Sequence, residues 1–215
     1  MKCFGLTPAS VLQRSTPNTI KPAPSLLFSI LFGSLSFGAV SAFAYAIWAF
    51  RLVPGRTAMY CAIAAIYIGL SGLALSRLAI APKIKLRFSL FFASSFVVYA
   101  IFWCLLWFGL KGKYHGDLWG SLLGLAAMTW LFQKAFDSKN GFLAAFAILF
   151  TFYTIGYYLG YEANTYFGAT TGRLLWGAAH GLGFGAGLGY LVFHCQKPLI
   201  AAMKSNAPPQ ETDPD

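Results

Sequence analysis

Long apolar stretches separated by short polar connections organise the chain between residues 25 and 196. A run of about 18 or more apolar residues is long enough to cross a bilayer as a helix. Six such stretches occur, at residues 25–50, 57–76, 88–110, 118–132, 141–161 and 172–194. The fourth of them is the shortest. The pattern predicts an all-α, polytopic transmembrane bundle of six helices over residues 25–196. Because the connections are short, neighbouring helices should be antiparallel.

The two ends of the chain differ from this central part. Residues 1–24 contain four prolines among Ser, Thr and Asn, which predicts a flexible tail. Residues 197–215 are polar and rich in Pro at their end, which predicts a disordered tail. A signal peptide is the competing interpretation of the first apolar stretch, since residues 42–44 resemble a cleavage site. The run nevertheless continues to Phe50 and is too long for a signal core, which favours a spanning helix.

Composition and charge place this bundle in a plasma membrane. The chain is 58% hydrophobic, which leaves no room for a soluble domain, and its net charge is +10. In a soluble protein that charge would favour nucleic acid as a partner. Here eleven of the 16 basic residues lie before the first apolar stretch or after the second, fourth or sixth. The positive-inside rule then predicts both termini in the cytoplasm of a plasma (inner) membrane, with the lipid bilayer as partner and no nucleic acid.

The connection between the second and third stretches has a distinct basic character. Its four cations are Arg77, Lys83, Lys85 and Arg87, spaced among apolar residues. Near an anionic membrane surface each cation contributes about 1 kcal/mol, so contact with lipid headgroups is one interpretation. Ordinary positive-inside charge is the other.

The sixth stretch carries glycine at every fourth position, and the fourth stretch carries a shorter series. Such spacing lets another helix backbone approach closely in a membrane. The candidate packing glycines are Gly116, Gly120, Gly124, Gly177, Gly181, Gly185 and Gly189. We expect the two series to pack against each other; pairing with a second copy, as a homo-oligomer, is the alternative.

The opposite side of the sixth stretch carries ionisable residues. Arg173, His180 and His194 fall within a sector of about 80° on a helical wheel. Ionisable groups in a membrane usually face the bundle interior or a cavity, so these three residues form a candidate polar path. Glu162 joins it, because it flanks the same outer connection as Arg173. His180 is then a hydrogen-bonded core residue, part of a proton or solute path, or a catalytic or metal-binding group.

Several chemistries lack the residues that they need. The three histidines have no paired spacing, and the four cysteines form no Cys-x-x-Cys, so no metal site and no cofactor are expected. No acidic residue lies near the middle of an apolar stretch, which argues against a coupled proton pump and against paired-carboxylate chemistry.

Two short segments resemble the rhomboid intramembrane proteases. His180 followed by Gly183 and Gly187 is similar to the catalytic histidine of the sixth rhomboid helix, and Gly120 and Gly124 are similar to glycines after the serine of the fourth. Trp119 stands where that serine would be. Ser121 is displaced by two residues, about 200° around a helix, and the connection at residues 51–56 is far shorter than the rhomboid loop. The resemblance therefore implies a degenerate rhomboid-like membrane protein without the serine nucleophile.

Three functional hypotheses follow from these patterns. The first is a non-enzymatic integral membrane protein, structural or assembly-related, which forms a homo-oligomer or binds a membrane-protein partner. The second is a small transporter or channel with its path along Arg173, His180 and His194. The third is the rhomboid-like protein. A filled interior would favour the first hypothesis, a cavity along that face the second, and a serine hydroxyl beside His180 the third.

Overall fold

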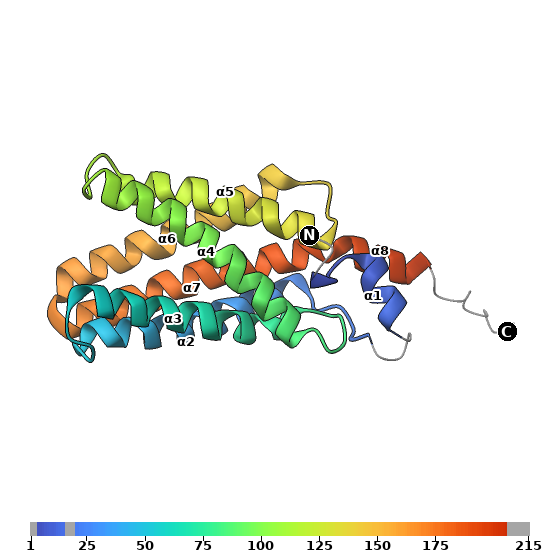
Figure 1. Cartoon of the computed structure of the whole chain (residues 1–215), viewed down its shortest axis with the longest axis horizontal. Coiled ribbons are helices and arrows are strands. Elements are labelled where there is room, and N and C mark those ends of the chain that lie inside the picture. The colour runs from blue at the N-terminus through green and yellow to red at the C-terminus, as the bar shows by residue number, and fades with distance from the viewer. Residues whose placement is uncertain (1–3, 16–19, 206–215) are drawn as a thin grey trace, which may run out of the picture.

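The computed structural model describes residues 4–15 and 20–205, and all regular structure in these residues is helical. Six long helices form an elongated bundle, and two short helices lie together at one end of it (Figure 1). The helices are α1 (Pro8–Arg14), α2 (Leu26–Ala49), α3 (Arg56–Leu75), α4 (Lys85–Gly109), α5 (Gly116–Phe136), α6 (Phe142–Phe167), α7 (Ala169–Cys195) and α8 (Lys197–Ser205). A 3₁₀ turn, Ser76–Leu78, continues α3.

Four of these helices are long and apolar enough to cross a membrane: α2, α4, α6 and the helix Arg56–Leu78. Large apolar side chains on their outer faces, such as Leu35, Leu105 and Leu143, are exposed, as expected of a surface that contacts lipid rather than water. The architecture is that of a helical membrane protein. α5 and α7, which carry the two glycine series, are not among the four.

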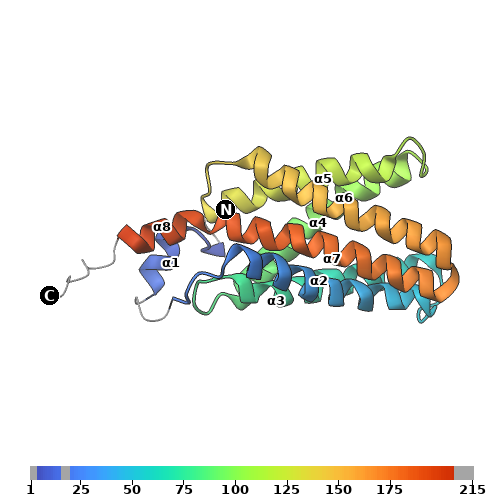
Figure 2. The same cartoon turned by 180° about the vertical axis from the view of Figure 1, so that it is seen from behind.

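The helix α7 lies between α2 and α6, and its two sides are packed differently from the sequence expectation (Figure 2). The predicted contact between the two glycine series is wrong. The glycines of α7 face α2 instead, where added Cβ atoms at Gly177, Gly181, Gly185 and Gly189 would meet Tyr45, Ser41, Gly33 and Ser29. The glycines of α5 face α4, where Gly116, Gly120 and Gly124 lie against Leu106, Trp103 and Tyr99.

Close approach of α2 and α7 also allows hydrogen bonds from side chain to backbone. The hydroxyl of Ser41 lies 2.6 Å from the carbonyl oxygen of Gly177, and that of Ser34 lies 2.9 Å from the carbonyl oxygen of Leu182. Such bonds form only where small residues bring the two backbones together. Glycine and serine therefore fix the position of α7 against α2.

The first half of α4 packs mainly through aromatic side chains. α4 crosses diagonally, from α3 near its own start to α5 near its end (Figure 1). Buried phenylalanines of α4, including Phe88, Phe91 and Phe92, fill the space under this crossing. Phe91 and Phe132 of α5 meet edge to face with their ring centroids 4.8 Å apart. Aromatic contacts rather than glycines thus hold this part of the core.

The regions expected to be tails are partly ordered. Residues 8–14, placed by the sequence in a flexible tail, form α1, whose first turn is capped by the Thr7 side chain and begins with Pro8. Residues 197–205, placed in a disordered tail, form α8. Val11 of α1 and Leu199 of α8 are buried, as is Leu6 just before α1. The rest of both predicted tails, apart from residues 4–7, 15 and 20–24, lies outside the described residues.

Candidate functional site

His180 lies in the middle of α7 inside a box of aromatic rings. Its side chain is only 9% exposed. The ring of Tyr153 is 5.0 Å away between centroids, that of Tyr157 is 5.8 Å away and that of Phe184 is 5.9 Å away. Both imidazole nitrogens are buried and have no hydrogen-bond partner among the described residues. A neutral imidazole has one donor and one acceptor, so this arrangement leaves both unsatisfied.

The hydroxyl group of Tyr153 belongs to a cluster of three hydroxyl groups. The Tyr153 hydroxyl lies 2.8 Å from the Tyr99 hydroxyl and 2.9 Å from the Ser121 hydroxyl. These three residues join α4, α5 and α6. The Ser121 hydroxyl lies 2.7 Å from the backbone oxygen of Asp117. No described hydroxyl is hydrogen bonded to His180, so the structure holds no serine–histidine pair of the kind that a rhomboid-like reaction needs.

The other members of the predicted polar path are not brought to His180. Arg173 points toward α2: its guanidinium lies 4.9 Å from the centre of the Trp48 ring and 3.4 Å from the Trp48 carbonyl oxygen. Glu162 is exposed, and no ion pair between it and Arg173 is present in the described residues. His194 lies at the opposite end of α7, with its Nε2 3.1 Å from the carbonyl oxygen of Asn140.

The face of α7 between His180 and His194 is a helix-packing surface against α6. A Cβ on Gly183 would lie 2.8 Å from the Gly156 Cα, and one on Gly187 would lie 3.0 Å from the Leu149 Cα. Backbone atoms of α6 therefore occupy the space that a polar path would follow. The side of α7 that the sequence predicts to be polar therefore packs closely against α6, and His180 and His194 lie far apart along it.

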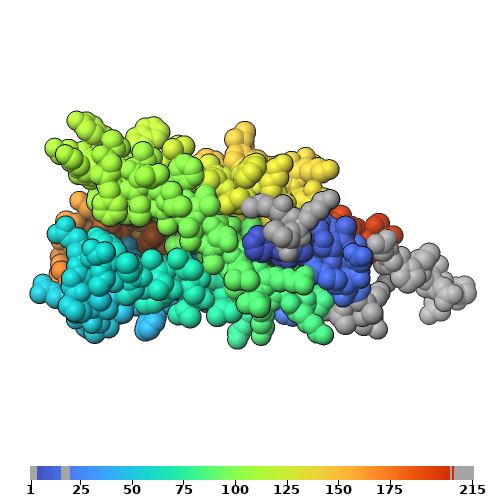
Figure 3. All heavy atoms as spheres, in the orientation of Figure 1, coloured from blue at the N-terminus to red at the C-terminus, as the bar shows by residue number. Residues whose placement is uncertain are grey.

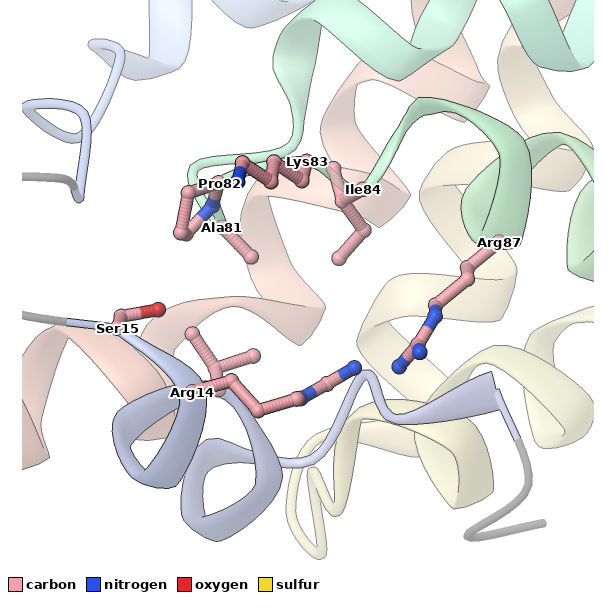
Figure 4. A pocket seen from close by; sticks show the side chains of 8 residues that line it. Arg14, Ser15, Ala81, Pro82, Lys83, Ile84 and Arg87 are labelled. Carbon is pink, nitrogen blue, oxygen red and sulfur yellow. The ribbon is translucent and has the colours of Figure 1, made fainter.

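A separate pocket of about 420 Å³ lies at the end of the bundle where α1 sits (Figure 4). Three cations line it: Arg14 from α1, Lys83 from the turn before α4, and Arg87 from the first turn of α4. The guanidinium groups of Arg14 and Arg87 point toward each other from opposite sides (Figure 4). All the cations concerned are exposed, but two residues of the basic connection, Arg77 and Lys85, are not among the residues that line the pocket.

The wall of this pocket is held in place by the end of α7. Gln196 is buried, and its amide nitrogen donates to the Leu78 carbonyl at 3.0 Å while its amide oxygen accepts from the Ile80 backbone at 2.9 Å. Leu78, Ala79 and Ile80 are themselves almost fully buried. The connection after α3 is thus a fixed structure rather than a flexible basic loop.

Sequence reasoning missed the two other polar residues of this pocket, Arg14 and Ser15. They belong to a segment that is rich in proline, and nothing in its local pattern indicates that it folds back under α4. Gln196 is a sequence signal only for the connection after α3, because an amide at the end of an apolar stretch needs polar partners. Within the described residues, no group of three or more His, Cys, Asp or Glu side chains could hold a metal ion.

Comparison with protein-family models, with curated proteins and with solved structures found no match to this chain. The fold and the geometry of its sites therefore carry the functional argument, and they define a helical membrane protein.

Proposed function

We propose that this chain is a six-span integral protein of the plasma (inner) membrane with both termini in the cytoplasm. Beside the four apolar helices run α5 and α7, with 21 and 27 residues. At about 1.5 Å per residue, both are long enough to cross a hydrocarbon core of about 30 Å. Their glycines lower the hydropathy but are matched to close helix contacts. The excess of basic residues on alternate connections supports the orientation.

We further propose that its role is non-enzymatic, as a structural or assembly component that forms a homo-oligomer or binds another membrane protein. The observation that carries this proposal is the closure of α7 on both sides. On one side a Cβ at Gly33 would lie 2.5 Å from the Gly185 oxygen, and on the other a Cβ at Gly156 would lie 2.6 Å from the Ala179 oxygen. A central helix wedged between two backbones supports a rigid scaffold.

A small transporter or channel is the second candidate, and two observations favour it. The imidazole of His180 lacks a partner, so a passing solute or water could satisfy it. Figure 3 also shows the surface hollowed between α3 and the ends of α4 and α5 nearest their connection, with atoms of the orange part of the chain, around the end of α6 and the start of α7, at its floor.

A flux measurement on reconstituted protein separates the two functions. Liposomes would contain the wild-type chain, the His180→Phe variant or no protein, with entrapped dyes that report protons, potassium and chloride. We expect the same rates in all three samples, because the α7 face between its histidines is packed against α6. A flux that exceeds the protein-free rate and falls in His180→Phe would overturn the scaffold proposal and favour transport.

A further inference from the structure

We propose that the pocket between α1 and the start of α4 binds a phosphate group, and that its occupant is the headgroup of an anionic phospholipid. The site is defined by Arg14, Ser15, Lys83 and Arg87. This inference adds a specific lipid ligand to the proposed scaffold. Placing this headgroup in the cytoplasmic leaflet rests on the proposed orientation of the chain, whereas the phosphate chemistry of the pocket does not.

The first argument is uncompensated positive charge. Arg14, Lys83 and Arg87 line one pocket, and no ion pair involves them in the part of the chain that the structure describes. Arg14 donates from its Nε to the Ser10 carbonyl at 2.7 Å and from an Nη to the Gly5 carbonyl, both of which are neutral. These bonds orient the guanidinium but leave its charge unbalanced. Arginine forks match the geometry of phosphate oxygens, so a phosphate would supply the missing negative charge.

The second argument is the helix that begins at the pocket wall. α4 starts at Lys85, directly after the pocket residue Ile84, and it has no side-chain cap and no acidic residue in its first turn. The first N–H groups of such a helix have no partner within the helix, and the helix dipole makes this end positive. An anion beside it is therefore stabilised. Arg87 lies in the same first turn and adds its charge to that of the helix end.

The third argument is a polar group left without a partner. The hydroxyl oxygen of Ser15 lines the pocket, is shielded from solvent and has no hydrogen-bond partner within residues 4–15 and 20–205. In Figure 4 it points from the end of α1 toward the pocket. A hydroxyl in this position can donate to a phosphate oxygen.

The backbone of Lys83 has φ +50°, which is less favourable for lysine than for glycine. A lysine at this position therefore has a local conformational cost.

Location favours a lipid over a soluble phosphate compound. The pocket lies where α4, one of the four apolar helices, begins. Leu86 and Leu90 lie on either side of the pocket residue Arg87 in the sequence of α4 and are 69% and 53% exposed, so an apolar surface extends from the site along the helix. A headgroup bound by Arg14 and Arg87 would leave its acyl chains free to lie on that surface. Basic pockets at the membrane surface of helical proteins are suited to such headgroups.

The test measures binding to the full-length protein in a neutral detergent by isothermal titration calorimetry, with three soluble ligands. Dihexanoyl phosphatidylglycerol carries both phosphate and acyl chains, dihexanoylglycerol carries only the chains, and glycerol 1-phosphate carries only the phosphate. We expect the phospholipid to bind at least tenfold more tightly than either of the others. Equal affinity for glycerol 1-phosphate would assign the pocket to a soluble phosphate compound and overturn the lipid assignment.

Four charge-removing variants separate the pocket from general surface charge. Arg14→Gln and Arg87→Gln should each weaken phosphatidylglycerol binding at least tenfold, because each removes a lining cation. Arg77→Gln and Lys85→Gln remove the same charge from the same connection outside the pocket, and should change affinity less than twofold. An equal loss in all four would show diffuse surface attraction and overturn the proposal.

Two further samples keep the result interpretable. Arg87→Lys retains the charge and should therefore bind with an affinity between those of the wild type and Arg87→Gln. An unchanged thermal midpoint in Arg87→Gln shows that its loss of binding is not misfolding. A chain ending at Ser205 lacks the acidic residues Glu211, Asp213 and Asp215. A tenfold rise in affinity on this truncation would mean that the acidic tail is the natural occupant, and would overturn the lipid assignment. Neither result depends on topology or flux, so this proposal fails separately from the proposed function.

Discussion

At the scale of single residues, the absence of one methyl group sets the distance between α2 and α7. A Cβ on Gly33 would lie 2.5 Å from the Gly185 oxygen and 2.8 Å from the Gly189 Cα, closer than real Cβ atoms approach backbone. Neither backbone can give way easily, because α7 is held on its other side by Gly156 and Gly183 of the contact with α6. The two contacts therefore constrain each other.

The Gly185→Ala substitution tests this constraint. Despite the higher helix propensity of alanine, we expect it to lower the free energy of unfolding by about 1–3 kcal/mol, because the added methyl group overpacks the α2 contact. Gly69→Ala is the matched control: it is also within a helix, and a Cβ there meets nothing within 4 Å. It should be neutral or stabilising by up to about 1 kcal/mol. Denaturant or thermal unfolding in detergent measures both, and equal stability of the two variants would contradict the close contact.

The glycine spacing reveals that these residues approach another backbone, but it does not identify the partner. The regular series of α5 is the obvious match for α7 in sequence, yet α5 packs on α4. The true partner surface on α2 also repeats every four residues, at Ser29, Gly33, Phe37, Ser41 and Tyr45, but only one of these residues is glycine, so a search for glycine series does not find it. The pairing follows from how all six helices pack, and that information is not local.

At the scale of elements, Tyr153 joins three helices that share few other polar contacts. Its hydroxyl lies within hydrogen-bond distance of Tyr99 on α4 and Ser121 on α5, while Tyr153 itself belongs to α6. In an apolar environment no water competes for these groups, so their hydrogen bonds fix the relative position of the helices. The Tyr153 side chain is buried in the core. Its role depends on two partners distant in the chain.

We expect Tyr153→Phe to destabilise the protein by about 1–2 kcal/mol, because it removes two hydrogen bonds and leaves the ring in place. Tyr158→Phe is the control, since that side chain is 38% exposed on the same helix, and it should change stability by less than about 0.5 kcal/mol. The midpoint of thermal unfolding in detergent compares the two. A smaller loss in Tyr153→Phe than in the control would show that the cluster does not hold α4, α5 and α6 together.

At the scale of the whole molecule, the sequence predicts the six long helices and their order, but not the way in which its ends complete the structure. Segment boundaries shift by several residues, and α5 and α7 each extend beyond the predicted stretch. α1 and α8 have no strong signal of their own, because short helices are stabilised mainly by tertiary packing. Leu6 and Val11 become buried only when α1 meets the bundle. The basic pocket arises from the same long-range contact, which brings Arg14 beside Arg87.

The number of membrane crossings is the remaining property of the whole molecule, and it depends on α5 and α7, of which α5 can be tested directly. If α5 crosses, its two flanking connections lie on opposite sides of the membrane; if it does not, they lie on the same side. Lys113 and Lys139 are exposed residues in these connections. In a background without Cys3, Cys61, Cys104 and Cys195, Lys113→Cys should react with a membrane-impermeant maleimide added outside intact cells. Lys139→Cys should react only after the membrane is permeabilised. Reaction of both cysteines from the outside, or of neither, would place both ends of α5 on one side of the membrane and contradict the six-span topology. That topology requires α5 to cross, because only then do the connections rich in basic residues lie on one side.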